Sequence, residues 1–309
     1  MQTFSEKVKQ ELVQYKYENS STKAILSSFL TNNLIISFDI NGEVWEIKSQ
    51  ALSTIKLIDT FFKHLYSVKQ TLSYTSINKL NSHRTYKLSL VGNFKQITND
   101  LELNINYPKN ILKKTIDQRA YLVGAFLSGG SISSIDKSIY HLEIRSTKIN
   151  YLRLIQKILE KFHISISLLK RKSNYVLYIK KSADVSDFLK IIGANHSMYE
   201  LEDKVIARDY YTNIQRLNNL DMANLHKSSL AGFVQIKMIK QIRHTKEFQS
   251  QPDKFKFYCS IRLQNPHSSL SEIVSIFKNK YKIQITRTGI NHYVLKIKEL
   301  FTLVNKHCN

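Results

Sequence analysis

The stretch AYLVGAFLSGG, from Ala120 to Gly130, holds three of the eight glycines of the chain at the end of an apolar run. A phosphate-binding glycine loop precedes the N-terminus of a helix, whereas this glycine pair follows a run with helical character, so a phosphate cradle is disfavoured. Glycine commonly ends a helix, and Gly124 beside Ala125 gives a small-residue face on which another helix can pack closely. The stretch therefore predicts a helix over about 118–128 that lies tightly against a second helix.

The second helix is predicted by an internal repeat with an offset of 97 residues. WEIKS at Trp45–Ser49 recurs as LEIRS at Leu142–Ser146, and KAILSSFLTNN from Lys23 stands where RAYLVGAFLSGG from Arg119 stands, one residue shorter. Each copy shows an apolar helix, two alternating strands, an amphipathic helix and two more strands. The predicted fold class is α+β, a duplicated αββαββα unit with repeats over about 20–105 and 115–195.

The charge of the chain favours a polyanionic partner. Its 309 residues include 46 Lys or Arg and 24 Asp or Glu, a formal net charge of +22, and nucleic acid is the first candidate for such a surface. Cys259 and Cys308 form no CxxC and stand in no metal-ligand pattern, which indicates a reducing compartment, no metal and no cofactor. Because no apolar run approaches the ~20 residues of a membrane span, a cytoplasmic protein is expected. With nucleic acid as its partner, it would be associated with the nucleoid.

The sequence changes character after Ala194. A long helical stretch follows, predicted as a connecting pair of helices with a break near Leu220–Leu225, and the polar, proline-containing HTKEFQSQPDK predicts a linker. We place the duplicated domain at 1–200, the helical connection and linker at 201–250, and a final all-α domain at 251–309. From Lys237 to the end there are 14 basic and 4 acidic residues, so this segment is strongly basic.

The final domain has the pattern of a helix-turn-helix. Ser269 followed by Glu272 is a capping box that opens a helix, and Thr286 or Thr288 is suited to cap a second helix. A recognition helix contacts bases and phosphates mainly through its N-terminal residues. The predicted DNA-binding residues of this helix are Arg287, Thr288, Asn291, His292, Lys296 and Lys298. The alternative is a helical hairpin that caps a larger core.

These blocks carry a family resemblance. LVGAFLSGG, with its degenerate copy LSSFLTNN from Leu26, resembles the LAGLIDADG motif of homing endonucleases, whose paired helices pack on small residues and end in an acidic metal ligand. A closer similarity is to the WhiA family of bacterial regulators. It is carried, in the order of the family, by SEKVKQEL, RAYLVGAFLSGGSI, YHLEIRS, DFLKIIGA, RLNNLDMANLHKS, NPHSSLSEIVSIF and TRTGINHYVLKIKEL.

The resemblance implies a LAGLIDADG-like domain fused to a C-terminal helix-turn-helix. It further implies a DNA-binding transcription regulator, linked to sporulation in some bacteria and to cell division and chromosome segregation in others. Departures from the family are Asn32 and Asn33, where glycines are usual, and Tyr293, where Arg is frequent.

Alignment on the endonuclease motif places Asn32 and Gly129 where the metal-binding acids would stand, and neither can act as a carboxylate. We call Asn32 and Gly129 the degenerate metal positions. The nearest acids, Asp39 and Asp136, follow the predicted helix ends by several residues. Loss of nuclease chemistry with retention of a DNA-binding surface is therefore the hypothesis, and the protein is expected not to be an enzyme.

Within RLNNLDMANLHKS the polar residues allow two interpretations, a solvated helix face or a contact with nucleic acid that the family resemblance favours. These residues are Arg216, Asn218, Asn219, Asn224 and Lys227, and the candidate DNA contacts among them are Arg216, Asn219, Asn224 and Lys227. Double-stranded DNA is the expected partner, other regulators or RNA polymerase are further candidates, and the oligomeric state stays open. The rival functions are an active LAGLIDADG homing endonuclease and a basic RNA-binding protein.

Overall fold

The structure is a computed structural model that describes residues 2–40, 42–66, 68–76, 84–133 and 140–306. The chain forms two compact units, Met1–Arg208 and Asp209–Asn309. The long helix α8 (Asn195–Ile242) begins in the first unit and ends in the second. Each unit has its own hydrophobic core, and each is described by itself.

The first unit contains the duplicated αββαββα arrangement that the sequence predicts. The first copy comprises α2 (Asn19–Asn33), β1 (Leu34–Asp39), β2 (Gly42–Ser49), α3 (Leu52–Leu65), β3 (Lys69–Ser76), β4 (Arg84–Val91) and α4 (Lys95–Asp100). The second comprises α5 (Thr115–Gly129), β5 (Gly130–Ile132), β6 (Leu142–Ser146), α6 (Ile149–Lys161), β7 (Ser167–Arg171), β8 (Asn174–Ile179) and α7 (Ser182–Ile191). The antiparallel sheets have the equivalent orders β1-β2-β4-β3 and β5-β6-β8-β7, so the repeat is structural as well as sequential.

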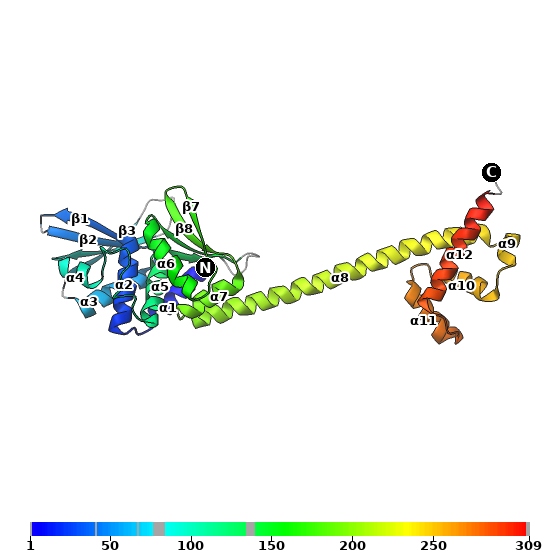
Figure 1. Cartoon of the computed structure of the whole chain (residues 1–309), viewed down its shortest axis with the longest axis horizontal. Helices are drawn as coiled ribbons and strands as arrows, with labels where there is room; N and C mark the ends of the chain where they lie inside the picture. The colour runs from blue at the N-terminus through cyan, green and yellow to red at the C-terminus, as the bar shows by residue number, and fades with distance from the viewer. Residues whose placement is uncertain (1, 41, 67, 77–83, 134–139, 307–309) are drawn as a thin grey trace. The chain divides into compact units, whose positions relative to one another are not determined.

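The two copies meet through α2 and α5, which lie side by side in the middle of the unit with one sheet on either side (Figure 1). A Cβ atom added to Gly124 would collide with the carbonyl oxygen of Ile25 and would lie 2.9 Å from the Cβ of Ser28. The backbones approach this closely only because position 124 has no side chain. Ser28, in turn, shares a 3.0 Å hydrogen bond with the buried hydroxyl of Tyr151 on α6.

Each sheet buries one face against the helices. In the first sheet the cross-strand partners Trp45 and Leu90 are fully buried, and Trp45 stacks on Phe94 with ring centroids 4.3 Å apart. Residues that alternate with these, such as Glu46 and Ser89, lie on the opposite face, as the two-residue period of a strand requires. The polar faces of both sheets are thereby available to other partners.

A helix that was not predicted from the sequence precedes the first copy. α1 (Phe4–Val13) begins with a capping box in which Thr3 Oγ1 accepts from the amide of Glu6 and the amide of Thr3 donates to Glu6 Oε2. Ser5 Oγ accepts from the amide of Ile132 at 2.7 Å and donates to its carbonyl at 2.9 Å. This pair of hydrogen bonds fixes α1 to β5 of the second copy.

The helical connection differs from the prediction in two respects. α8 is continuous through Leu220–Leu225, where a break was expected, because it contains neither proline nor glycine before Gly232. The segment expected to be a linker contains α9 (Lys246–Gln249), capped by Thr245, and its Phe248 is buried in the core of the second unit. One buried aromatic side chain in a polar segment suffices to dock it.

The second unit is entirely helical in the part that the structure describes. Besides the end of α8 and α9 it contains α10 (Asp253–Gln264), α11 (Leu270–Tyr281) and α12 (Arg287–Lys306). Its core is formed mainly by aliphatic and aromatic side chains of all five helices, and the buried Arg262 donates to the carbonyl of Ser268 at 2.6 Å. This bond fixes the turn between α10 and α11, since a buried guanidinium requires such acceptors.

We predict that Gly124→Ala destabilises the first unit, by about 1–3 kcal/mol, because the new Cβ must push α2 and α5 apart. Thermal unfolding of the full chain measures the effect. Gly92→Ala is the matched control, since its nearest neighbour would be Val68 Cγ1 at 3.8 Å and the change should be close to neutral. Equal unfolding temperatures for the two variants would contradict the close helix contact.

Candidate nucleic-acid interface and degenerate metal positions

The degenerate metal positions lie at the C-terminal ends of α2 and α5, where their side chains or backbone serve the fold. Asn32 Nδ2 donates to Ser128 Oγ at 3.0 Å and to the carbonyl of Arg145 at 3.2 Å. Asn33 Nδ2 donates to the carbonyl of Ser128 at 3.2 Å. Amide groups thus tie the end of one central helix to the end of the other, a role that a metal-binding carboxylate could not fill.

Gly129 leaves no room for an acidic side chain in this arrangement. A Cβ at this position would collide with the carbonyl oxygen of Arg145 and would lie 2.8 Å from Asn32 Nδ2. Among the described residues, no group of three or more His, Cys, Asp or Glu side chains is placed to hold a metal ion. Of the two acids considered from the sequence, Asp39 ends β1, and Asp136 lies outside the described residues.

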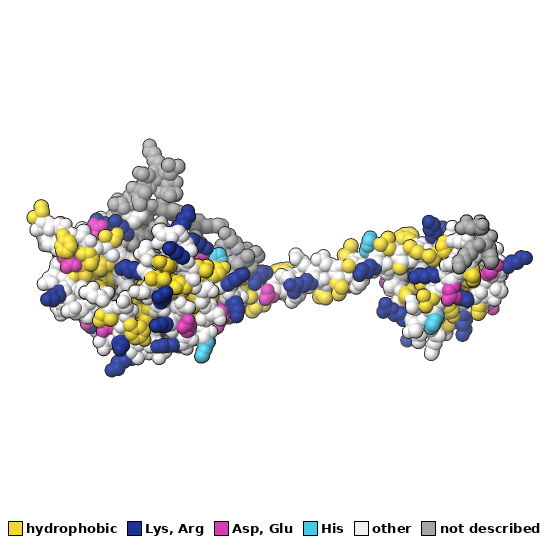
Figure 2. Space-filling view, turned by 45° about the horizontal axis from the view of Figure 1, so that its top comes forward, with side chains coloured by type: hydrophobic (Ala, Val, Ile, Leu, Met, Phe, Trp, Pro, Cys, Tyr) yellow, Lys and Arg dark blue, Asp and Glu magenta, His cyan; other side chains and the backbone are white. Residues whose placement is uncertain are grey.

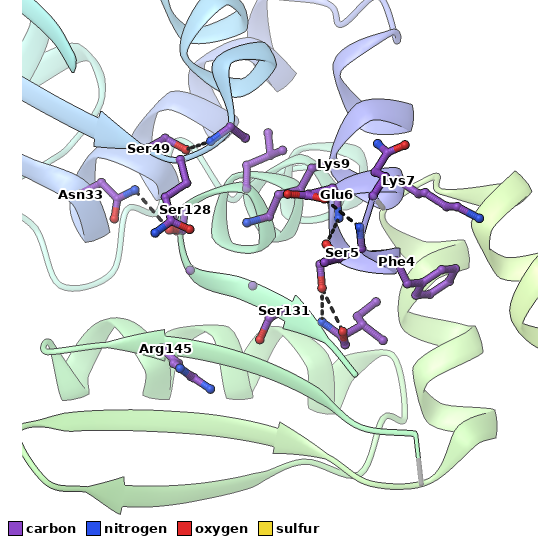
Figure 3. Close-up of a pocket in the computed structure, with 18 of the residues that line it drawn as sticks. Phe4, Ser5, Glu6, Lys7, Lys9, Asn33, Ser49, Ser128, Ser131 and Arg145 are labelled. Carbon is purple, nitrogen blue, oxygen red and sulfur yellow. Dashed lines mark hydrogen bonds between the residues drawn. The ribbon is translucent and has the colours of Figure 1, made fainter. Parts of the chain in front are cut away.

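A cleft of about 1390 Å³ opens where α2 and α5 end (Figure 3). It is lined by the N-terminal segment and α1 (2–7 and Lys9), by the helix ends and β5 (Asn33 and 127–132), by strand and flanking residues (48–51, 85, 86 and Arg145), and by α8 (Glu200 and Lys204). Lys48 and Arg145 are repeat equivalents, so both copies contribute to it. We refer to this space as the helix-end cleft.

On the polar face of each sheet, one carboxylate pairs with two cations. Glu46 contacts Lys87 at 2.5 Å and Lys48 at 3.5 Å, and at the equivalent position Glu143 contacts Arg145 at 2.6 Å and Arg171 at 3.1 Å. Burial by itself would raise the pKa of Glu143, but its hydrogen bonds to Arg145 and the charges of both arginines hold that pKa below its ordinary value. The sheet faces are therefore less cationic than the residue counts suggest.

The second unit presents the predicted recognition helix. Thr286 Oγ1 accepts from the amide of Gly289 at 3.1 Å, so Thr286, not Thr288, caps α12. Ahead of it, α11 starts with the capping box of Ser269 and Glu272 and ends at Lys282, which adopts a left-handed conformation. The amide of Ile283 donates to the carbonyl of Phe277 across this turn, and the chain is redirected into α12.

The six candidate residues on α12 are all exposed, in the arc of the helix that its buried residues leave free. The buried set is Ile290, Val294, Ile297 and Leu300. Arg287, Asn291 and Lys298 lie within about 40° of one another around the helix axis and form one edge of the exposed face. Lys296 differs from them, because its ammonium is 3.4 Å from the carboxylate of Glu299 and part of its charge is offset.

Tyr293 belongs to the packing of the domain. Its ring lies 5.8 Å from that of Phe255 and 5.6 Å from that of Tyr258, both buried. The tyrosine therefore holds α12 against α10 and does not extend the exposed basic edge. His292, one residue earlier, is exposed and lines a shallow pocket with Phe255 and Lys296.

On α8, the four candidate residues Arg216, Asn219, Asn224 and Lys227 are exposed. At 3.6 residues per turn they fall within an arc of about 140°, whereas the neighbouring Asn218 points to the opposite side. In the part of the chain that the structure describes, these four side chains have no hydrogen bond or ion pair. Figure 2 shows basic side chains at intervals along this helix and over both units.

Comparison with known proteins finds matches over both units. Residues 118–211 match the family model of the WhiA LAGLIDADG-like domain, and residues 214–301 match that of the WhiA C-terminal HTH domain. A "Probable cell division protein WhiA" of Oceanobacillus iheyensis is 30% identical over 304 residues, which cover 96% of each chain. The chain belongs to the WhiA family. A protein of the same name from Bacillus licheniformis is 29% identical, again with 96% of each chain covered.

Solved structures support the fold of this WhiA-family chain. Full-length DUF199/WhiA from Thermatoga maritima aligns with a TM-score of 0.60 and 22% identity, covering 97% of this chain and 98% of that one. The N-terminal LAGLIDADG domain of DUF199/WhiA aligns with a TM-score of 0.52 and 23% identity, covering 62% and 91%. No helix among the described residues is long and apolar enough to cross a membrane.

Several residues around the cleft were not found from the sequence. Glu46 and Glu143 each pair with cations of their own sheet, and these contacts depend on the register of neighbouring strands. Their equivalent positions in WEIKS and LEIRS could have indicated that the two glutamates have the same role. Lys9 was missed because α1 was not assigned, and nothing local to SEKVKQEL says that this helix covers the second copy.

Proposed function

We propose that this WhiA-family protein is a sequence-specific DNA-binding transcription regulator, linked to cell division and chromosome segregation, without nuclease activity. The observation that carries the proposal is the exposed edge of α12, which begins at the helix N-terminus with Arg287 and Asn291 and reaches Lys298 about three turns along. Arg and Asn are the side chains that make bidentate contacts with guanine and adenine in the major groove. A helix N-terminus adds affinity for a phosphate.

The name of the relatives supports the link to cell division. The proteins from Oceanobacillus iheyensis and Bacillus licheniformis are both called probable cell division proteins. On this proposal the protein acts on the nucleoid, double-stranded DNA is its main partner, and other regulators or RNA polymerase are further partners. Its net charge of +22 favours such polyanionic binding without selecting a sequence.

A second DNA contact on α8 forms part of the proposal. Four asparagines occur between 213 and 224, although this residue is unfavourable inside a helix. All four asparagines are exposed, so no packing contact compensates for their low helix propensity. Base or phosphate contacts by Arg216, Asn219, Asn224 and Lys227 would account for polar side chains gathered on one arc.

We infer the lack of nuclease activity from the helix ends. Metal-assisted hydrolysis of a phosphodiester needs carboxylates that hold the ion against the phosphate. The Asn32 amide is committed to Ser128 and to the backbone of Arg145, and Gly129 is enclosed by the same groups. The rival function of an active homing endonuclease thus lacks its metal ligands at the motif positions.

For the recognition helix, we expect Arg287→Ala and Asn291→Ala each to cost about 1–3 kcal/mol on the preferred duplex and to relax its specificity. Fluorescence anisotropy against the preferred duplex, a random duplex and a structured RNA of equal length measures the loss. Lys254→Ala on α10 removes the same charge as Arg287→Ala at another exposed site and should have little effect. An equal loss on random duplex would show backbone contacts instead, and a preference for the RNA would favour the RNA-binding alternative.

For α8, we expect Asn219→Ala and Asn224→Ala to weaken duplex binding several-fold, whereas Asn218→Ala does not. The three changes are chemically identical and all sit on exposed helix positions, so helix propensity affects them alike. The same anisotropy titration, with circular dichroism as a check on helix content, gives the comparison. Equal affinities for all three variants would show that these asparagines form a solvated helix face and do not contact DNA.

For catalysis, we expect no nicking of supercoiled plasmid by the purified protein with Mg²⁺ or Mn²⁺, and none by Gly129→Asp, whose side chain has no space. Gel electrophoresis of the plasmid over time is the measurement, with a metal-free lane as the background. Metal-dependent nicking that vanishes in Asp136→Ala would overturn the assignment and restore the endonuclease function.

A further inference from the structure

The helix-end cleft has an excess of cationic side chains. Lys7, Lys9, Lys48, Arg145 and Lys204 line it, against the carboxylates of Glu6 and Glu200. Both carboxylates already have partners: Glu6 accepts from the amide of Thr3 at 2.7 Å, and Glu200 lies 2.7 Å from the ammonium of Lys7. Neither carboxylate makes an ion pair with Lys9, although the charge of Glu6 acts on it and offsets part of the effect of burial.

Lys9 differs from its cationic neighbours in the cleft because it makes no ion pair within the described part of the chain. Lys48 and Arg145 contact the sheet carboxylates Glu46 and Glu143, whereas Lys9 has no hydrogen bond or ion pair with any described residue. Its ammonium lies 5.8 Å from the ring of Phe126, a fully buried residue near the end of α5. Lys9 is itself half-buried, and this burial lowers its pKa to about 8.

An unpaired ammonium in such a place destabilises the ligand-free protein, because desolvation of a charge is costly unless another charge compensates it. The same group is well suited to an anion that enters the cleft. In Figure 3 Lys9 reaches from α1 toward the cleft, and Asn33, Ser128, Ser131 and Arg145 are placed around it. The Ser131 hydroxyl makes no hydrogen bond to any residue that the structure describes, so it is available to a ligand.

Other residues that line the cleft suit a ligand that carries an organic group besides its anion. Tyr86 offers an aromatic ring, Gln50 and Asn33 offer amides, and the Gly129–Gly130 backbone borders the space without side chains. An aromatic ring with amides suits a planar heterocycle, and an ammonium with hydroxyls suits a phosphate. We propose that the helix-end cleft binds a small phosphate monoester of mononucleotide size, with Lys9 as the cation that pairs with the phosphate.

A free small molecule fits this site better than the backbone of DNA. The phosphate must come near a half-buried ammonium beside the fully buried Phe126, below a rim that α1 forms and that Ser5 fixes to Ile132. A terminal phosphate can enter alone, whereas a phosphate within a duplex is held in line by its neighbours. The site would make the regulator responsive to a metabolite, and it is independent of DNA recognition by α12.

The test uses the full chain, DNA-free, with inorganic phosphate, AMP, GMP, CMP, UMP and a short random duplex as probes. Thermal shift and isothermal titration are measured for the wild type, for Lys9→Met and for the control Lys16→Met, an exposed lysine outside the cleft. We expect saturable binding of at least one mononucleotide to wild type and control, weakened at least tenfold in Lys9→Met. Inorganic phosphate should bind more weakly than that mononucleotide.

A second readout separates a binding role from a structural one. Without ligand, Lys9→Met should unfold at a higher temperature than wild type at pH 7. The folded-state pKa of Lys9 is lowered, so the cost of its charge is complete below about pH 8 and declines as pH rises from there toward 10.5. The advantage of the variant should therefore shrink at pH 9.5; the facing charges Glu6, Lys7, Lys48, Arg145, Glu200 and Lys204 are common to both proteins.

Three binding outcomes and one stability outcome would overturn the proposal. One is the absence of binding by every mononucleotide, and another is equal binding by wild type and Lys9→Met. The third is a Lys9-dependent shift by the duplex alone, which would assign the site to the DNA backbone. A lower unfolding temperature for Lys9→Met would show that Lys9 stabilises the ligand-free fold, which contradicts the unpaired cation.

Discussion

The contact of α2 with α5 at Gly124 determines the arrangement of the first unit. Because the backbone of Ile25 occupies the place of a side chain at position 124, the helices are held at a separation that no other residue type permits. Each helix continues into the first strand of its own sheet, at Leu34 and at Gly130. The distance between the helices consequently fixes where the two sheets stand and brings the two helix ends together, and the helix-end cleft is the result.

The chemistry of these helix ends follows from the same proximity. Two acids facing each other there would repel unless an ion lay between them. Here the amides of Asn32 and Asn33 bridge to Ser128 and to the backbone of Arg145, so the close approach is stabilised without an ion. Carboxylates occur one strand further out, at Glu46 and Glu143, where each is already neutralised by cations of its own sheet.

Local pattern in the sequence was sufficient for much of this architecture. The duplication, the C-terminal end of α5 and the capping box at Ser269 were predictable from the pattern of the sequence itself. The continuity of α8 was not predicted because its asparagine-rich segment has a composition typical of turns. The burial of Phe248 was not predicted because a single apolar residue shows no helical or strand periodicity. The unpaired Lys9 required knowledge of which helix faces which, and that depends on contacts more than a hundred residues apart, such as Ser5 with Ile132.

α1 has a consequence for symmetry. The two copies have the same strand order and place equivalent residues on either side of the cleft. By themselves they would form a cleft with pseudo-twofold symmetry. α1 precedes the first copy only, yet it is fixed to β5 of the second, so one wall of the cleft is built from a segment that has no duplicate. A fold made by doubling therefore contains a helix-end cleft that lacks twofold symmetry, so its two ends can distinguish the two ends of an asymmetric ligand.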